Sequence, residues 1–485
     1  MSIVAIDQGT TSTRALRVDR VGQVQAIASR ELQQHYPEPG WVEHDPEHIW
    51  RDTLAVLREV IDDGVEAIGI TNQRETILLW DRATGTPLHR AIVWQDRRTA
   101  DYCAGLAADG LEPMIQTKTG LLADAYFSGT KLRWMLDRIP GARARAERGE
   151  LAAGTVDCFL LWRLTGGRVH ATDTTNAART MLYDISAHRW DQDLLALLDI
   201  PAALLPAVHD NVHLFGETDP AVLGHVLPIA GMAGDQHAAM VGQGCFAPGM
   251  IKSTYGTGCF LLAHVGETPR FSTHRLLTTP AYRIGGKTAY ALEGSIFVAG
   301  AAVKWLRDGL GILDDVQRSA EIAATLPYDH GVHFVPAFGG LGAPYWIPEA
   351  RGMIIGIGPR TGPAHFIRAA LEAAAFQTAD LIDTIIQDTG LEPRLLRIDG
   401  GMARNDWLAQ FLADLLQLGI ERPVNHEATA LGAACLAGLG IGFWSGLSDL
   451  PVGTNANRKD FAPAALPDRR GLRAAWASAV AAASR

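Results

Sequence analysis

The chain has 485 residues, 47% hydrophobic and 20% charged, which is an ordinary globular composition but too long for a single hydrophobic core. Its net charge of −10 offers no electrostatic basis for binding nucleic acid or inserting into an anionic membrane. The five cysteines are scattered, and no basic or apolar leader precedes the first strand. We therefore expect a cytoplasmic protein of two or three domains, without disulfides, a zinc site or a transmembrane helix.

The first predicted element is a β-hairpin over residues 3–18, where two apolar strands flank a polar turn. Gly9 allows a ligand to approach the backbone, and hydroxyl groups follow it at Thr10, Thr11, Ser12 and Thr13. Such a turn suits phosphate oxygens, and Asp7 at the end of the first strand suits a metal ion. A plain polar surface turn is the alternative, and this segment alone does not decide between them.

Alternating helical and strand patterns follow and indicate an α/β protein. A helix is predicted over residues 48–62, and strands over 67–71, 76–80 and 91–94. A dense polar cluster between two of these strands contains Arg74 and Glu75. Polar side chains concentrated between buried strands favour a site over a solvated loop.

A carboxylate next follows a buried strand. The predicted strand 226–230 leads into small residues and then Asp235. Ligands in open α/β sheets bind at the carboxyl ends of strands, so Asp235 is placed to accept a proton from a substrate hydroxyl attacking phosphorus. The alternative is that Asp235 caps the N-terminus of a helix, and the roles of cap and proton acceptor are compatible.

The N-terminal pattern recurs after a predicted joint at residues 242–249. Residues 250–262 again form a strand, a Gly/Thr turn containing Thr257, and a strand. We therefore expect two similar domains, 1–246 and 247–485, that hold a polyphosphate between two Gly/Thr hairpins.

Two further elements complete the second half. A long helix is predicted over residues 363–389, with Thr361 as its cap, Pro363 in its first turn and Gly390 at its end. A strand at 396–399 then enters a double glycine and a helix, where Asn405 is placed to reach a base unless this is a simple strand–helix turn.

Three familiar motifs are not supported. No G-x-G-x-x-G occurs, so a Rossmann site is not indicated. Gly286, Lys287 and Thr288 resemble the end of a Walker A motif, but they fit a Gly-Gly hairpin turn better. His209 and His213 lack the glutamate of a zinc-binding helix and are interpreted as surface or loop residues.

Taken together and in order, the motifs of the chain resemble those of the FGGY carbohydrate kinases. They are the segments 7–12, 70–76, 126–131, 234–236, 255–258 and 399–401, and the resemblance extends to about residue 444. Any one motif is weak, whereas the ordered set is highly specific. Segments 41–46, 92–95 and 342–346 narrow the resemblance to members that phosphorylate glycerol.

The resemblance implies two RNase H-like domains of the actin/Hsp70/sugar-kinase type, facing each other across a nucleotide-binding cleft. It implies ATP and Mg²⁺ as cofactors, glycerol as substrate, and a homodimer or homotetramer. Asp235 matches the general base. The positions that match glycerol contacts are Arg74, Glu75, Trp94, Tyr126, Asp235, Gln236 and Phe260. The positions that match nucleotide contacts are Thr10, Thr11, Ser12, Arg14, Thr257, Gly300, Gly401 and Asn405, with Asp7 near the metal.

The chain departs from the family pattern at several positions. Lys304 stands where glutamine is common near the nucleotide, and its ammonium is placed to contact a phosphate or lies on a solvated helix face. His237 replaces a second glutamine, and Gly340 replaces a small hydroxyl residue. The loop 218–227 lacks the Gly-x-Arg through which some relatives bind fructose 1,6-bisphosphate, so strong inhibition by that sugar is not expected.

Three other functions are weighed against this hypothesis. A kinase for another polyol or ketose would need a wider pocket than Arg74, Trp94, Tyr126 and Phe260 suggest. An actin- or Hsp70-like ATPase would hydrolyse ATP without needing a polyol. A catalytically dead sensor is disfavoured because both Asp7 and Asp235 are present.

Overall fold

The computed structural model describes residues 1–423, 427–453 and 458–485. The N-terminal hairpin forms as predicted, with Ser2 paired to Asp19 and Gln8 to Thr13 in antiparallel register. It lies within a six-stranded sheet of order β13-β14-β5-β1-β2-β3. The strands are β1 Ser2–Gln8, β2 Ser12–Asp19, β3 Val24–Glu31, β5 Val65–Asn72, β13 Val212–Glu217 and β14 Pro228–Gly234.

The C-terminal half contains a seven-stranded sheet of order β17-β18-β16-β15-β21-β22-β23. Its strands are β15 Met250–Tyr255, β16 Cys259–Gly266, β17 Leu277–Ile284, β18 Lys287–Ile296, β21 Leu395–Asp399, β22 Ile420–Pro423 and β23 Arg458–Phe461. In both sheets an antiparallel unit is followed by two parallel strands and an antiparallel edge strand; the antiparallel unit has three strands in the N-terminal sheet and four in the C-terminal sheet, where β17 is added. The repeat predicted from the two hairpins therefore extends across both sheets.

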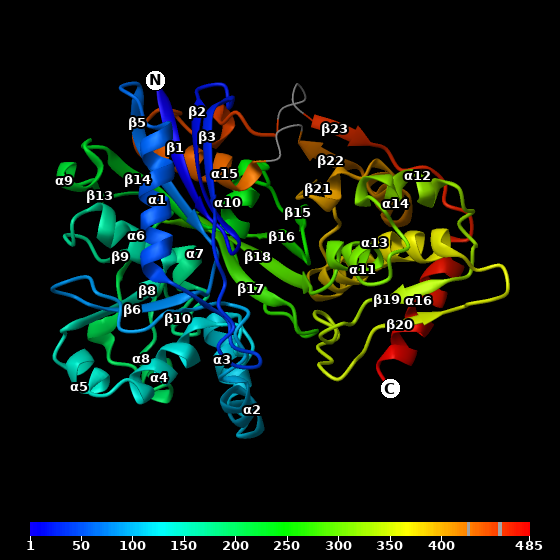
Figure 1. Ribbon diagram of the computed structural model, residues 1–485, viewed down its shortest axis with the longest axis horizontal. Helices are drawn as coiled ribbons and strands as arrows, with labels where there is room; N and C mark the ends of the chain where they lie inside the picture. The colour runs from blue at the N-terminus through cyan, green and yellow to red at the C-terminus, as the bar shows by residue number, and fades with distance from the viewer. Residues whose placement is uncertain (424–426, 454–457) are drawn as a thin grey trace.

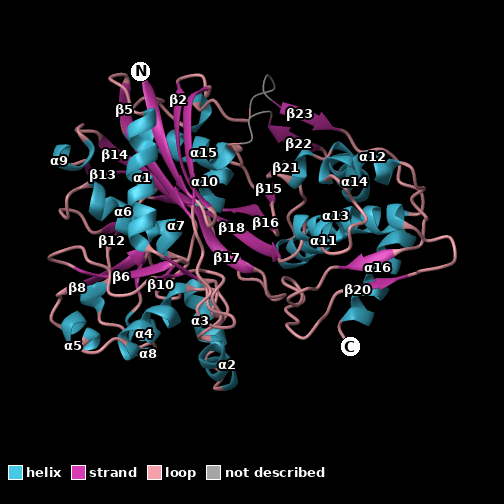
Figure 2. Ribbon diagram, in the orientation of Figure 1, coloured by secondary structure: helices cyan, strands magenta, loops and turns pink. Residues whose placement is uncertain are grey.

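Helices from both halves cover the N-terminal sheet (Figures 1 and 2). One face packs against α1 Pro46–Val60 and α6 Val156–Leu164. The other packs against α10 Asp235–Gly242 and α15 Ala428–Gly440. Although α15 follows β22 in the chain, it contacts β1, β5 and β14 and lies against α10. This crossover joins the two halves through a shared core.

A smaller lobe extends from the N-terminal half (Figure 1). Its four-stranded sheet has the order β4-β7-β6-β8. These strands are β4 Glu43–His44, β6 Ile77–Asp81, β7 Ala91–Ile92 and β8 Leu151–Thr155. The surrounding helices are α2 Ala100–Ala108, α3 Glu112–Thr119, α4 Ser128–Arg138, α5 Ala142–Glu147 and α8 Gln192–Leu197. The lobe carries Trp94 and Tyr126 of the candidate site, whereas Phe260 lies on β16 of the C-terminal sheet.

Short elements complete the N-terminal half. They are β9 Ala171–Asp173, α7 Thr174–Ala177, β10 Tyr183–Asp184, β11 Arg189–Trp190, β12 Ala207–His209 and α9 Pro220–Leu223. The side chains of His209 and His213 stack on each other 4.0 Å apart, and no cluster of metal-ligating side chains occurs among the described residues. The Gly285–Gly286 turn between β17 and β18 has positive φ at both glycines, as a tight hairpin requires.

The C-terminal half is built around the long helix α13, Pro363–Thr389. Pro363 and Gly390 occupy the predicted ends, but the cap is Gly362 and not Thr361. The Thr361 hydroxyl instead accepts a hydrogen bond from the Gly358 backbone at 2.9 Å, which takes it away from the helix. The other helices and strands are α11 Gly300–Asp308, α12 Ser319–Ala324, β19 His333–Val335, β20 Met353–Ile355, α14 Asp406–Leu416 and α16 Arg469–Ala483.

In the part of the chain that the structure describes, no helix combines the length and hydrophobicity needed to cross a bilayer.

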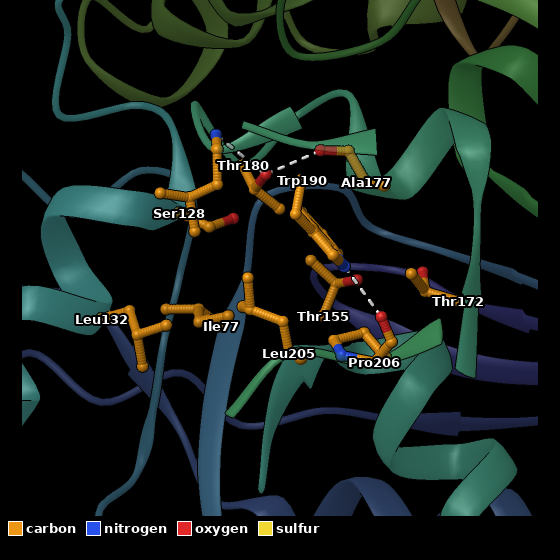
Figure 3. A pocket seen from close by; sticks show the side chains of 12 residues that line it. Ile77, Ser128, Leu132, Thr155, Thr172, Ala177, Thr180, Trp190, Leu205 and Pro206 are labelled. Atoms are coloured by element: carbon orange, nitrogen blue, oxygen red, sulfur yellow. Dashed lines mark hydrogen bonds between the residues drawn. The ribbon is translucent and has the colours of Figure 1, made fainter. Parts of the chain in front are cut away.

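A small, mainly apolar cavity lies inside the N-terminal half, and the Trp190 ring nitrogen donates a hydrogen bond to the Pro206 carbonyl at its wall (Figure 3). None of the candidate site residues lines this cavity, so the site must be sought elsewhere.

The α10–α15 contact depends on glycines that admit close backbone approach. A Cβ added at Gly432 of α15 would overlap the Ala238 carbonyl oxygen of α10. We expect Gly432→Ala to lower the free energy of unfolding by about 1–3 kcal/mol, because overpacking forces the helices apart. Chemical denaturation measures this change. Gly105→Ala is the control, because that helical glycine has open space around it and alanine is the better helix former. Equal effects of the two substitutions would contradict the close contact.

Candidate functional site

Arg74 lies at the centre of the candidate site, in the turn between β5 and β6. Its guanidinium is buried and forms a bidentate ion pair with Glu293 of β18, at 2.6 Å from Nη1 and 3.0 Å from Nη2. Its Nε lies 3.2 Å from Oδ1 of Asp235. A buried guanidinium needs such partners, since an unpaired charge in the protein interior is very unfavourable.

A second buried arginine completes this ion cluster. Arg179 donates from Nε to Glu75 at 2.6 Å and from Nη2 to Glu293 at 3.0 Å. Although burial raises the pKa of Glu293, Arg179 and Arg74 hold it at about 2, so this carboxylate stays ionised. Glu75 has φ of 61°, a left-handed conformation that directs its side chain into the cluster at a cost in backbone strain.

Asp235 is the first residue of α10, and Gly234 is the N-cap. The predicted cap role of Asp235 is thus taken by its neighbour, although the Asp235 carboxylate accepts from the Gln236 backbone at 2.7 Å. Its side chain keeps 29% of its surface exposed. Burial raises its pKa, while Arg74 and Lys252 oppose the rise. A carboxylate that is both partly shielded and still reachable can accept a proton from a bound hydroxyl.

Gly234 is needed for the contact between Arg74 and Asp235. A Cβ at this position would lie 2.7 Å from Cγ of Arg74 and 3.2 Å from Nδ1 of His237. His237, one of the departures from the family pattern, is fully buried, and burial lowers its pKa far below the usual value. It is therefore a neutral residue behind the site, where it contacts Thr279 at 3.3 Å.

Aromatic side chains form the opposite wall. The Trp94 ring packs edge-on against Tyr126 and Phe260, with centroids 5.7 and 6.0 Å away. The Tyr126 hydroxyl accepts a hydrogen bond from Arg74 at 3.4 Å, which connects the aromatic side chains to the ion cluster. Trp94 Nε1 donates to the Thr10 hydroxyl at 2.9 Å, so the same ring also contacts the first Gly/Thr turn.

Further contacts connect the aromatic side chains back to the residue that follows Asp235. Lys252 of β15 donates to the side-chain oxygen of Gln236 and, at 3.3 Å, to the Phe260 carbonyl. The structure thus brings together every residue expected to contact glycerol, namely Arg74, Glu75, Trp94, Tyr126, Asp235, Gln236 and Phe260.

The first of the two Gly/Thr turns has side chains available to a ligand. Gly9 donates its backbone N–H to the Ser12 carbonyl at 2.9 Å, which closes the turn and leaves Thr11 exposed. The Arg14 guanidinium bridges Asp7 and Glu427, and its bond to Glu427 is 2.6 Å. Burial raises the pKa of Asp7, and the charge on Arg14 opposes that rise.

The second turn is attached to the start of α11. Thr257 is exposed, and its carbonyl accepts from Ala301 at 3.0 Å, while Gly300 donates to the Gly256 carbonyl at the same distance. A Cβ at Gly300 would lie 2.5 Å from that carbonyl, so glycine is needed for the close approach. Thr257 and Gly300 are therefore neighbours, as the expected nucleotide contacts require.

The remaining nucleotide candidates lie beyond this turn. Lys304, one turn along α11, and Gly401, before α14, are exposed. Asn405 caps α14 by accepting from Leu408 at 2.9 Å and donates to Ser319 at 3.0 Å. The amide of Asn405 is thus engaged at both ends, and a base would have to share it through the second lone pair or hydrogen.

Asp7 supplies a carboxylate of the kind that binds a magnesium ion. It lies near the end of β1, where burial raises its pKa and the charge on Arg14 opposes the rise. Mg²⁺ is commonly bound through one or two carboxylates and substrate phosphates, with waters completing its shell. Asp7 fits that pattern.

Sequence reasoning missed Lys252, Glu293 and Arg179. Lys252 and Glu293 are charged residues inside otherwise buried strands, and that isolation was an available signal. Arg179 follows a short helix, in a segment whose sequence gives no comparable signal. Their importance depends on contacts across the chain that spacing does not reveal.

Two family models match the chain, one in each half. The N-terminal domain model of the FGGY family of carbohydrate kinases matches residues 2–242, and the C-terminal domain model matches residues 251–441. The chain belongs to the FGGY family of carbohydrate kinases. The fold class expected from its motifs is confirmed by this match and by the solved structures below.

Relatives of this FGGY kinase are similar over nearly its whole length. It is 57% identical to a glycerol kinase of Gluconobacter oxydans, over 96% of this chain and 92% of that protein. It is 54% identical to glycerol kinase 1 of Pseudomonas aeruginosa, over 99% and 98%. The crystal structure of Plasmodium falciparum glycerol kinase with ADP superposes with a TM-score of 0.94 at 35% identity, covering 99% and 98% of the two chains.

The ion cluster predicts a large effect of a small change. Glu293→Gln leaves two buried guanidinium groups without their shared counter-charge, so we expect the free energy of unfolding to fall by about 3–5 kcal/mol. Denaturant titration measures the loss. The matched control is Glu59→Gln, which removes an ion pair with Arg30 whose side chains are 47% and 44% exposed. The control should change stability by less than about 1 kcal/mol, and a comparable loss would contradict the cluster's role.

Proposed function

We propose that this FGGY kinase transfers the γ-phosphoryl group of ATP to a terminal hydroxyl of glycerol. The observation that carries the proposal is a continuous set of contacts that joins Asp235 and the buried ion cluster to the aromatic side chains of Tyr126, Trp94 and Phe260. A triol offers only hydroxyls and three carbons. A site that pairs each hydroxyl with a polar group discriminates against analogues that lack one, because the partner group is left unsatisfied.

In the proposed reaction Asp235 is the general base. The hydroxyl oxygen forms a bond to the γ-phosphorus, the bond to the β–γ bridging oxygen breaks, and ADP leaves. The hydroxyl proton passes to the Asp235 carboxylate, which should contribute about 10²–10⁴-fold to the rate. Arg74 orients that carboxylate from 3.2 Å and cannot itself take the proton.

The other residues bind and orient the reactants. Arg74, Glu75, Tyr126 and Gln236 are assigned to the glycerol hydroxyls, and Trp94 and Phe260 to its carbon edge. The nucleotide is assigned to Thr10, Thr11, Ser12, Arg14, Thr257, Gly300, Lys304, Gly401 and Asn405. Asp7 would hold Mg²⁺, which supplies charge neutralisation of the transferred phosphoryl group when bound.

The proposed units are residues 1–246 and 247–485, which carry one Gly/Thr turn each. The hydrogen bond from Trp94 to Thr10 supports placing glycerol next to the phosphate groups, because it joins an expected glycerol contact to the first Gly/Thr turn.

The cysteines of the described residues are all free and buried, which supports a reducing, cytoplasmic location.

The substrate and the base are tested together. Purified protein with Mg²⁺ and ATP is given glycerol, dihydroxyacetone, erythritol, xylitol or xylulose, and ADP release is measured. We expect release to require glycerol and kcat to fall about 10²–10⁴-fold in Asp235→Asn, which keeps the size of the side chain but not its basicity. Asp199→Asn, at an exposed turn residue, is the control. Turnover of a larger polyol alone would overturn the substrate, and polyol-independent hydrolysis would overturn the kinase activity.

The protonation of Asp235 predicts the acid side of the pH profile. Burial raises the pKa of this carboxyl above that of an ordinary aspartate. As the pH falls through the raised pKa the carboxylate takes up a proton and stops acting as a base, so kcat/KM for glycerol should decline at a higher pH than an exposed aspartate would give. Initial rates between about pH 4 and 8 measure this limb. A flat profile in that range would contradict the assignment.

A further inference from the structure

Lys252 is a buried cation beside the proposed glycerol site. Lys252 lies on β15 and has no exposed surface, and its ammonium group donates hydrogen bonds to three oxygens. These are Oε1 of Gln236, Oγ1 of Thr254 at 3.0 Å and the Phe260 carbonyl at 3.3 Å. An ammonium group has three N–H donors and no acceptor, so these contacts use it completely.

This saturation sets the orientation of the Gln236 amide. A group that only donates must face the carbonyl oxygen of an amide and not its NH₂ group. The NH₂ group then points away from Lys252. Among the described residues, no hydrogen bond involves this nitrogen, so it is available to a ligand bound beside Asp235.

We propose that Lys252 is a positioning residue that locks the Gln236 amide with its NH₂ group toward the polyol. The inference rests on the proposed function and deepens it, because it specifies that the substrate oxygen facing Gln236 must accept a hydrogen bond. With the amide locked, the substrate must present an acceptor to Gln236, while Asp235 and Glu75 provide acceptors for its hydroxyl protons. A hydroxyl satisfies both demands.

The same ammonium links Gln236 to the aromatic wall. By holding the Phe260 carbonyl, it fixes the backbone of the residue whose ring packs against Trp94. Lys252 belongs to a strand of the C-terminal sheet, whereas Gln236 lies in the first turn of a helix on the N-terminal sheet. Removing the ammonium therefore releases the amide without removing any group that touches substrate, while Phe260 stays paired with Thr254 and Ser295 in the sheet.

A double-mutant cycle tests whether Lys252 acts through Gln236. In the full-length protein, Lys252→Met should raise the KM for glycerol about tenfold, because a free amide loses its preferred orientation. The KM for ATP should change little. In a Gln236→Met background, the same Lys252→Met change should alter the glycerol KM less than about twofold, because no amide remains to be oriented. Gln236→Met alone gives the reference.

The controls separate a locking role from a structural one. If Lys252→Met does not fold, Lys252→Gln replaces it, because an amide offers both donor and acceptor and so removes the lock. Independent, multiplicative effects of the two substitutions on the glycerol KM would overturn the inference while leaving the kinase proposal intact. Wild-type protein that consumes ATP without regard to glycerol would overturn both.

Discussion

The charge on Arg74 is the constraint to which the rest of the site conforms. A guanidinium buried to this degree must be neutralised by nearby carboxylates, and the chain supplies Glu293 from the C-terminal half and Asp235 from the N-terminal half. The bidentate pair with Glu293 uses both terminal nitrogens. Nε then faces Asp235 at 3.2 Å, which helps to position the carboxylate that we assign as base.

Two repeated sheets give this cluster its setting. In each half the central antiparallel hairpin places a Gly/Thr turn at the same edge of the sheet as the ends of the parallel strands. Asp7 precedes the first turn and Asp235 follows β14, so both carboxylates come from strand ends. Helix α15 then packs on the opposite half's sheet, which makes the relative position of the two halves part of the core.

Much of this arrangement could be predicted from local sequence. The Gly/Thr turns, the polar segment around Arg74 and the small residues before Asp235 are all short-range signals at strand ends. The packing of α15 on the N-terminal sheet could not, because a buried helix of small residues fits many surfaces. Glu293, Arg179 and Lys252 were missed for a related reason, since the site residues that they contact, namely Arg74, Glu75 and Gln236, are 16 to 219 residues away. The Gly362 cap was missed because Thr361 satisfied the usual preference.

The central claim is that Asp235, Arg74 and Trp94 surround the polyol while both Gly/Thr turns hold the nucleotide. A crystal structure with glycerol, Mg²⁺ and a non-hydrolysable ATP analogue tests it most directly. The account predicts a terminal hydroxyl within hydrogen-bond distance of the Asp235 carboxylate and the phosphates against the turns at Thr10 and Thr257. Glycerol bound away from Asp235, or phosphates that touch neither turn, would contradict it.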